Sequence, residues 1–215
     1  MKSIIFDFDG VIADTQQYHA KIESELLVKI GIILSPNQIT QQYAGIEDYV
    51  FFNKLINKYK INNVDIDHLI ETKWNMMTKI IKKKGLKSIK GVSKFIVDLY
   101  QNKYKLAVAS ASPKKFLNYA LENLNIKKYF NVIVSSEQVD NGKPAPDIFL
   151  LTASLLNEIP QNCIVIEDGN NGIKGAKKAG MKTVGFDPNY DNNLYANKII
   201  RNFKELNAAT FLTLF

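Results

Sequence analysis

The chain has 215 residues, of which 46% are hydrophobic and 23% are charged, and this composition excludes a disordered or low-complexity protein. The net charge of +7 comes almost entirely from lysine, since Arg201 is the only arginine. Arginine is the usual side chain for bidentate recognition of phosphate and guanine, so we expect no nucleic-acid partner. The lone cysteine, Cys163, excludes an intramolecular disulfide and predicts a reducing compartment.

The apolar runs of the chain are all short. None approaches the length that spans a membrane, and the run near the N-terminus is interrupted by Asp7 too early for a signal peptide. We therefore expect a cytoplasmic protein with no membrane partner.

Five of these runs predict buried parallel strands, because they are continuous rather than alternating, as expected when both faces of a sheet are covered. In chain order they are residues 3–6, 106–109, 132–134, 163–166 and 183–186. Segments with helical periodicity lie between most of them, at residues 92–102, 114–123, 148–156 and 172–179. The alternation of strands and helices predicts a doubly wound, mainly parallel α/β sheet of the Rossmann type.

The interval between the first two predicted strands is about a hundred residues, which is too long for a single crossover helix. Candidate helices within it are residues 18–30, 36–44, 47–58 and 65–83. We therefore predict a helical domain, residues 15–84, inserted into an α/β core that comprises residues 1–14 and 85–215.

Polar residues recur where the predicted strands end. They are Asp7 and Asp9, Ser110, Lys143, and the pair Glu167 and Asp168. Each has an ordinary explanation by itself, such as a helix cap for Ser110. However, ligands bind at the carboxyl edge of open α/β sheets, and several buried carboxylates are costly unless a cation or a reaction requires them. Their joint occurrence predicts a functional site at this edge.

Four segments in order resemble the motifs of one enzyme family. DFDGVIADT at residues 7–15 is similar to the first motif of the haloacid dehalogenase superfamily of phosphotransferases, within it the β-phosphoglucomutase-like subfamily with a helical cap. Ser110 falls on the second motif, Lys143 on the third, and Glu167 with Asp168 on the fourth. The resemblance covers nearly the whole chain, and the inserted helices match the cap in position and helical character.

The resemblance implies a reaction through a phosphorylated aspartate. Asp7 would attack phosphorus, and Asp9 would protonate the leaving oxygen and then deprotonate the attacking water or alcohol. Haloacid dehalogenases and phosphonoacetaldehyde hydrolases lack an acid at the second position, so Asp9 indicates phosphate monoester chemistry.

The resemblance also implies the binding groups. Mg²⁺ would be held by Asp7, the Asp9 carbonyl and Asp168, with Glu167 supporting its water shell. The transferring phosphoryl group would be gripped by Lys143, by the Ser110 hydroxyl, and by the backbone N–H groups of Gly10 and Ala111.

The cap residues bear on the choice between phosphatase and mutase. His19 and Lys73 resemble cap residues of the mutase that lie near its acid/base loop and its substrate. Gly45-Ile46-Glu47-Asp48, however, stands where the mutase cap has G-x-S-R, whose arginine clamps the distal phosphate of a bisphosphate. We therefore predict a monomeric, Mg²⁺-dependent phosphatase that acts on a small phosphorylated metabolite such as a sugar phosphate. A β-phosphoglucomutase-type isomerase is the alternative, and a phosphate-binding module without turnover is less favoured.

Overall fold

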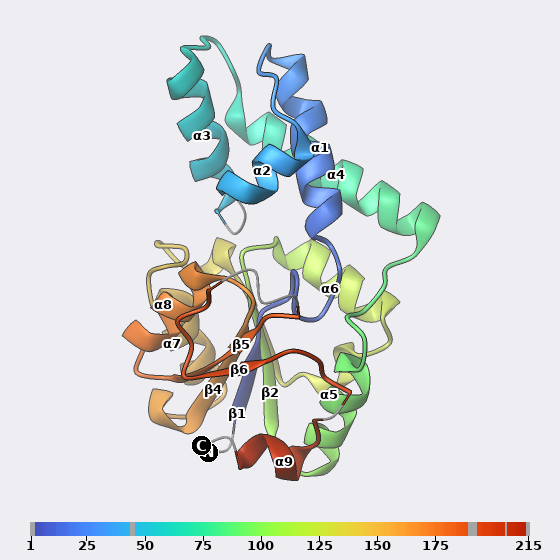
Figure 1. Cartoon of the computed structure of the whole chain (residues 1–215), viewed down its shortest axis with the longest axis vertical. Helices are drawn as coiled ribbons and strands as arrows, with labels where there is room; N and C mark the ends of the chain where they lie inside the picture. Colours follow the sequence, from blue (N-terminus) through green and yellow to red (C-terminus); the bar gives the residue numbers. More distant parts are fainter. Residues whose placement is uncertain (1–2, 44–45, 189–192, 205, 214–215) are drawn as a thin grey trace. The chain divides into compact units, whose positions relative to one another are not determined.

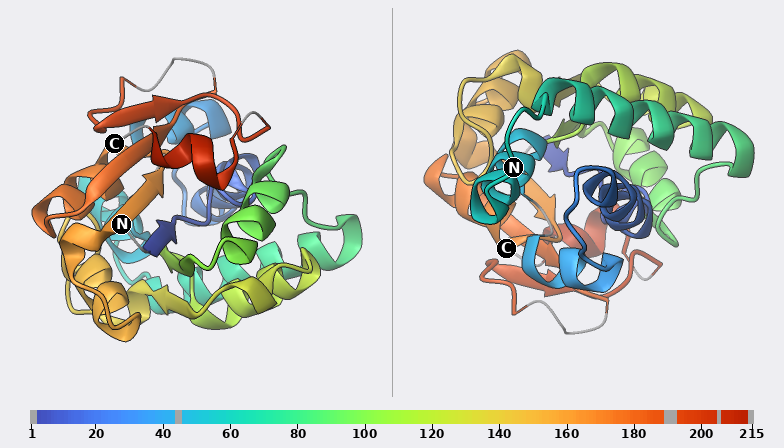
Figure 2. Two further views of the ribbon diagram at one scale, coloured as in Figure 1. Left: turned by 90° about the horizontal axis from the view of Figure 1, so that it is seen from below. Right: turned by 90° about the horizontal axis from the view of Figure 1, so that it is seen from above.

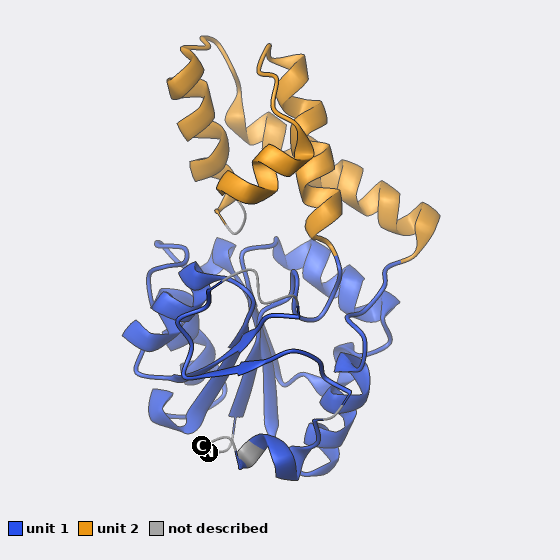
Figure 3. Ribbon diagram, in the orientation of Figure 1, with its two compact units in different colours: residues 1–14, 86–215 blue, residues 15–85 orange. Residues whose placement is uncertain are grey.

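The computed structural model describes residues 3–43, 46–188, 193–204 and 206–213 (Figure 1). The chain divides into two compact units, coloured separately in Figure 3. We call Met1–Asp14 with Leu86–Phe215 the core unit, and Thr15–Gly85 the helical unit.

The core unit is built on a six-stranded parallel sheet with the strand order β3-β2-β1-β4-β5-β6. The strands are β1 Ser3–Phe6, β2 Lys105–Ser110, β3 Val132–Ser135, β4 Cys163–Glu167, β5 Lys182–Phe186 and β6 Lys198–Ile200. The predicted doubly wound α/β sheet is thus confirmed. Phe6 pairs with Val108 on one side and with Ile166 on the other, so the residues that follow β1, β2 and β4 meet at one edge.

Helices cover both faces of this sheet (Figures 1 and 2). They are α5 Val92–Gln101, α6 Lys114–Asn123, α7 Asp147–Leu155, α8 Asn170–Lys178 and α9 Ala208–Leu212, with single 3₁₀ turns at Lys127–Tyr129, Ser136–Gln138 and Pro160–Asn162. Successive strand residues point to opposite faces. Accordingly, Ile5 packs in the cluster that includes Phe149 of α7 and Ala176 of α8, whereas Phe6 contacts Phe95 of α5 edge to face.

The helical unit contains α1 Gln16–Lys29, α2 Pro36–Tyr43, α3 Asp48–Tyr59 and α4 Ile66–Lys84. Its apolar core includes Leu27, Phe52 and Met77, all fully buried. Asp65 caps α4 by accepting the backbone N–H of His68 at 3.0 Å, and Gly85, with φ of +75°, ends the helix. None of the helices in the described part of the chain has both the length and the apolar composition needed to cross a membrane.

The elements differ from the predicted ones mainly at the C-terminal end, where β6 and α9 were not predicted. Both are short, three and five residues respectively. Helix α1 begins at Gln16, two residues before the predicted start, and α2 ends at Tyr43. Ala44, the last residue of the predicted second helix, lies outside the described residues, as does Gly45 of the GIED segment.

Candidate active site

Three carboxylates meet at the ends of β1 and β4. Asp7, Glu167 and Asp168 each offer an oxygen within 4.8 Å of the others. The sheet register causes this meeting, because the N–H of Asp7 donates to the Ile166 carbonyl at 2.9 Å and so places Asp7 beside Glu167. Asp7 and Glu167 are nearly buried, at 7% and 3% exposed. This is a set of oxygen ligands of the kind that Mg²⁺ prefers.

Lys143 inserts its ammonium group between two of these acids. The Nζ atom donates to Asp7 Oδ1 at 2.6 Å and to Glu167 Oε1 at 2.7 Å, and its third contact is the Ala109 carbonyl at 3.1 Å. All three donors of the ammonium are therefore used. The Lys143 side chain is only 9% exposed, so these charge-assisted bonds are shielded from water.

The pKa values of two acids in the cluster are raised, chiefly by burial. Burial raises the pKa of Asp7 to about 7, and although Lys143 opposes the shift, the charges of Glu167 and Asp9 add to it. Burial also raises the pKa of Asp168 well above its usual range, with Glu167 and Asp7 contributing. Burial alone would lower the pKa of Lys143, but the carboxylates of Asp7 and Glu167 raise it above its ordinary value. One lysine does not neutralise these acids, so the cluster suits a further cation.

Asp9 is half-buried and contacts the loop after β2. Ser112 Oγ donates to Asp9 Oδ2 at 2.5 Å, whereas Ser110 Oγ lies 3.5 Å from the same oxygen. The second distance is at the outer limit of a hydrogen bond. Ser110 was predicted as a site residue and Ser112 was not. The sequence Ser-Ala-Ser, with hydroxyls two positions apart at a strand end, was the available indication.

The backbone N–H groups predicted to bind the phosphoryl group are those of Gly10 and Ala111. The Gly10 N–H donates to the Ala13 carbonyl at 2.9 Å, and Ala111 is exposed, with its carbonyl accepting from Ser136 Oγ at 2.9 Å. Their contact with a phosphoryl group stays a prediction.

Two glycines make room for the acids because they have no side chain. A Cβ atom at Gly10 would lie 1.9 Å from Asp168 Oδ2, and one at Gly172 would lie 1.7 Å from Glu167 Oε1. Gly10 also has a φ of +80°, a conformation that other residues rarely adopt. Glycine is therefore required at both positions for the carboxylates to lie where they do.

In the helical unit, Lys73 is part of a buried ion cluster. Its Nζ donates to Glu23 Oε1 at 2.6 Å and to Asp48 Oδ1, and its side chain is 2% exposed. Trp74 Nε1 donates to the other oxygen of Asp48 at 2.8 Å, and the His19 ring lies edge to face with the Trp74 ring at 5.4 Å between centroids. Contacts of His19 and Lys73 with a substrate stay predictions.

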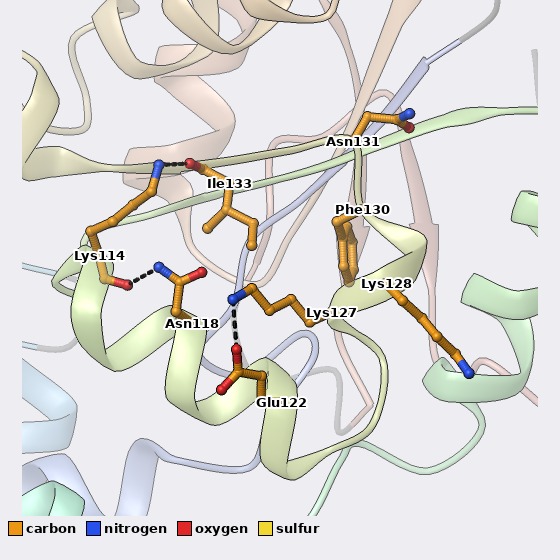
Figure 4. Close-up of a pocket in the computed structure, with 8 residues that line it drawn as sticks. All are labelled: Lys114, Asn118, Glu122, Lys127, Lys128, Phe130, Asn131 and Ile133. Atoms are coloured by element: carbon orange, nitrogen blue, oxygen red, sulfur yellow. Dashed lines mark hydrogen bonds and ion pairs between the residues drawn. The ribbon is translucent and has the colours of Figure 1, made fainter.

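A separate pocket of about 590 Å³ lies beside α6 in the core unit (Figure 4). It is lined by Lys114, Asn118, Glu122, Lys127, Lys128, Phe130, Asn131 and Ile133. Two of its lysines are engaged, Lys127 with Glu122 at 2.6 Å and Lys114 with the Ile133 carbonyl. The pocket shares no residue with the carboxylate cluster, so it is not the predicted site.

Comparison with protein families gives a match over residues 4–186, to the haloacid dehalogenase-like hydrolases. The chain belongs to this family. The matched span contains every residue of the carboxylate cluster together with Lys143, Ser110 and Ser112. The resemblance inferred from the four motifs is therefore confirmed.

Several relatives of this haloacid dehalogenase-like hydrolase have named activities. A phosphorylated carbohydrates phosphatase of Thermotoga maritima is 28% identical over 86% of this chain and 84% of its own length. A β-phosphoglucomutase of Bacillus subtilis is 32% identical over 86% of this chain and 83% of its own length. A fructose-1-phosphate phosphatase of Escherichia coli is 30% identical over 84% of this chain and 94% of its own length. A solved structure of β-phosphoglucomutase from Clostridium difficile superposes with a TM-score of 0.88 at 30% identity, covering 100% of this chain and 96% of that one. The chain is accordingly a phosphohydrolase or a phosphomutase.

Proposed function

We propose that this hydrolase is a Mg²⁺-dependent phosphatase that releases phosphate from a small phosphate monoester, such as a sugar phosphate, through an aspartyl-phosphate intermediate. The observation that carries the proposal is the placement of Asp7. Its carboxylate is buried, is held by Lys143 at 2.6 Å, and lies in the same site as Asp9. The named activities of the relatives support the same class of substrate.

In the first half-reaction, a carboxylate oxygen of Asp7 attacks phosphorus. A bond forms between Asp7 and phosphorus, the bond from phosphorus to the ester oxygen breaks, and Asp9 gives its proton to that oxygen, which leaves as an alcohol. Lys143 fixes the Asp7 carboxylate during this step and offers positive charge to the oxygens of the transferring group.

In the second half-reaction, water replaces the alcohol. Asp9, now ionised, takes a proton from the water as its oxygen attacks phosphorus, and the bond from phosphorus to Asp7 breaks. The products are inorganic phosphate and a regenerated Asp7 carboxylate, with Asp9 protonated again. No proton or electron has to come from outside the site.

The residues present fit a magnesium ion. Asp7, Asp168 and the Asp9 carbonyl are hard oxygen donors, and Glu167 adds a further acceptor for a bound water. The raised pKa values of Asp7 and Asp168 support this assignment, because a cation would remove their cost of ionisation. When bound, Mg²⁺ neutralises charge on the phosphoryl group and orients it.

A mutase of the β-phosphoglucomutase kind is the second candidate, favoured by the relatives from Bacillus subtilis and Clostridium difficile. Such an enzyme retains a bisphosphorylated intermediate and needs a second anion site. Asp48 stands where the mutase motif has its arginine, and its carboxylate is bound by Lys73 and Trp74. The segment thus supplies a second acid in place of a cation, which supports the phosphatase.

One pair of assays separates the two candidates. The purified protein with Mg²⁺ is incubated with a panel of sugar phosphates, and phosphate release is compared with a coupled assay for conversion of β-glucose 1-phosphate to glucose 6-phosphate. We expect phosphate release to be faster and Asp7→Asn to abolish it. Isomerisation faster than release would establish the mutase, and no turnover in either assay would favour the binding module. A monomeric state and a cytoplasmic location stay predictions, the first of which light scattering tests.

A further inference from the structure

We propose that Ser112 is a positioning residue for Asp9, and that its hydroxyl holds the Asp9 carboxylate in the orientation for proton transfer. The inference rests on the proposed function, because it assigns a role within the acid/base step. It concerns a contact that the four family motifs do not include.

The contact itself is short and shielded. Ser112 Oγ lies 2.5 Å from Asp9 Oδ2, and Ser112 is only 2% exposed. This distance is typical of a hydroxyl that donates to an ionised carboxylate, which is among the stronger hydrogen bonds in proteins. A hydroxyl both donates and accepts, so Ser112 can keep the contact whether Asp9 is ionised or protonated. The contact is made to the Oδ2 atom of the Asp9 carboxylate.

Ser112 is itself fixed from two sides. Its N–H donates to Ser110 Oγ at 3.1 Å, and its carbonyl accepts from Ser135 Oγ at 2.8 Å. Ser110 and Ser135 are the last residues of β2 and β3 and are paired in register. The orientation of Asp9, which follows β1, is thereby tied to the ends of two neighbouring strands.

The Ser110 hydroxyl makes a much longer contact with Asp9 than the Ser112 hydroxyl does. Ser110 Oγ is an acceptor for the Ser112 N–H, and its separation from Asp9 Oδ2 is 3.5 Å. Ser110 thus orients the loop, and Ser112 makes the direct contact with the acid. The two hydroxyls have different tasks.

A substrate whose leaving group needs no proton distinguishes two roles of Ser112, the positioning of Asp9 and general support of the fold. Alkyl phosphates expel a strongly basic oxygen and depend on the acid, whereas p-nitrophenyl phosphate expels a weakly basic phenolate that departs without one. The quantity kcat/KM reports the steps up to loss of the leaving group. Misplacing Asp9 should therefore lower kcat/KM for an alkyl phosphate far more than for the aryl phosphate.

The experiment compares Ser112→Ala, Ser112→Thr and Ser136→Ala on a hexose phosphate and on p-nitrophenyl phosphate. Ser136→Ala is the matched control, since its hydroxyl donates to the Ala111 carbonyl and not to an acid. For Ser112→Ala we expect about a 10- to 100-fold loss of kcat/KM on the hexose phosphate and less than about a 3-fold loss on the aryl phosphate. Ser112→Thr should restore most of the activity, because it keeps the hydroxyl.

An equal loss on both substrates, or no loss on either, would overturn the inference. If Ser112→Ala does not fold, Ser112→Cys replaces it, because a thiol has similar size and is a weak donor. The same pattern of losses is expected for Ser112→Cys.

Failure of the proposed function has a different signature, namely a wild-type protein that hydrolyses none of these esters. The positioning inference is then tested by crystal structures of the wild type and of Ser112→Ala. A wild-type contact between Ser112 Oγ and Asp9 Oδ2 together with a turned Asp9 in the variant supports it. An Asp9 side chain that is unchanged in the variant contradicts it.

Discussion

The ammonium of Lys143 lies 2.6 Å from Asp7 Oδ1 and comes from a loop that precedes α7, 136 residues further along the chain. The same ammonium bonds Glu167 at the end of β4, so Lys143 joins the acids of two adjacent strands. It supplies one positive charge to a cluster of several carboxylates. The imbalance of charge at this point leads to the first two predictions.

Mg²⁺ should stabilise the protein, because a ligand that binds only the folded state raises its unfolding free energy. At a concentration a hundred times its Kd, the expected gain is about 2.7 kcal/mol. Differential scanning fluorimetry with and without EDTA measures the corresponding rise in Tm. Asp168→Asn should reduce the gain, whereas Asp140→Asn, which changes an exposed acid of the core unit, should retain it. Equal gains in both variants would exclude Asp168 as a ligand.

The metal-free protein should lose stability as the pH rises. Burial raises the pKa of Asp7 in the folded protein to about 7, whereas an unfolded aspartate has a pKa of about 3.9. A carboxyl whose pKa is raised in the folded state makes its full contribution to the unfolding free energy below about pH 4. This contribution is lost as the pH rises from about 4 to about 7. Urea unfolding in EDTA at pH 5 and pH 7.5 should show a larger decrease for the wild type than for Asp7→Asn. Parallel decreases would show that Asp7 is not the responsible group.

Gly172→Ala should disturb the site and Gly169→Ala should not. A Cβ at Gly172 would lie 1.7 Å from Glu167 Oε1, whereas one at Gly169 would lie 3.6 Å from Glu167 Oε2, an ordinary contact. Displacing Glu167 by such an overlap should cost about 1–3 kcal/mol and weaken Mg²⁺ binding. Gly169 is the N-cap of α8, and Gly169→Ala should change the unfolding free energy by less than about 1 kcal/mol. Thermal unfolding and Mg²⁺ titration measure both effects, and equal behaviour of the two variants would be inconsistent with the observed position of Glu167.

Lys73→Met should destabilise the protein through the helical unit. The substitution leaves the carboxylates of Glu23 and Asp48 facing each other without the ammonium, and breaking a buried pair in this way costs about 3–5 kcal/mol. The control is Lys79→Met on the same helix, an exposed lysine for which a change within about 0.5 kcal/mol is expected. Chemical denaturation gives both values. A loss of activity by Lys73→Met with unchanged stability would instead favour a direct role at the substrate.

Much of the core was predictable from sequence because its strands are buried on both faces. Such strands are continuous apolar runs, and their parallel pairing brings the residues that follow them to one edge, so the meeting of Asp7 with Glu167 and Asp168 could be anticipated. Strand β6 could not, because it is a three-residue edge strand whose Lys198 and Ile199 are exposed. Its pairing with β5 depends on tertiary context rather than on a periodic pattern.

The contacts of the polar side chains were less predictable than their positions. Ser110 was predicted at the site and Ser112 was not, because which of two nearby hydroxyls reaches Asp9 depends on the path of the loop after β2. Likewise, Lys73 looks like an ordinary helix-surface lysine in the sequence. Its burial results from Glu23 and Asp48, which lie 50 and 25 residues away in the chain.

The most direct test of the account is to identify the residue that carries the phosphoryl group. The enzyme is quenched during turnover of a sugar phosphate with Mg²⁺, and borohydride then reduces any acyl phosphate to an alcohol that peptide mass spectrometry locates. We expect homoserine at position 7 and none in Asp7→Asn or without substrate. Continued turnover with no modification at position 7, or with the modification at another carboxylate, would contradict the account.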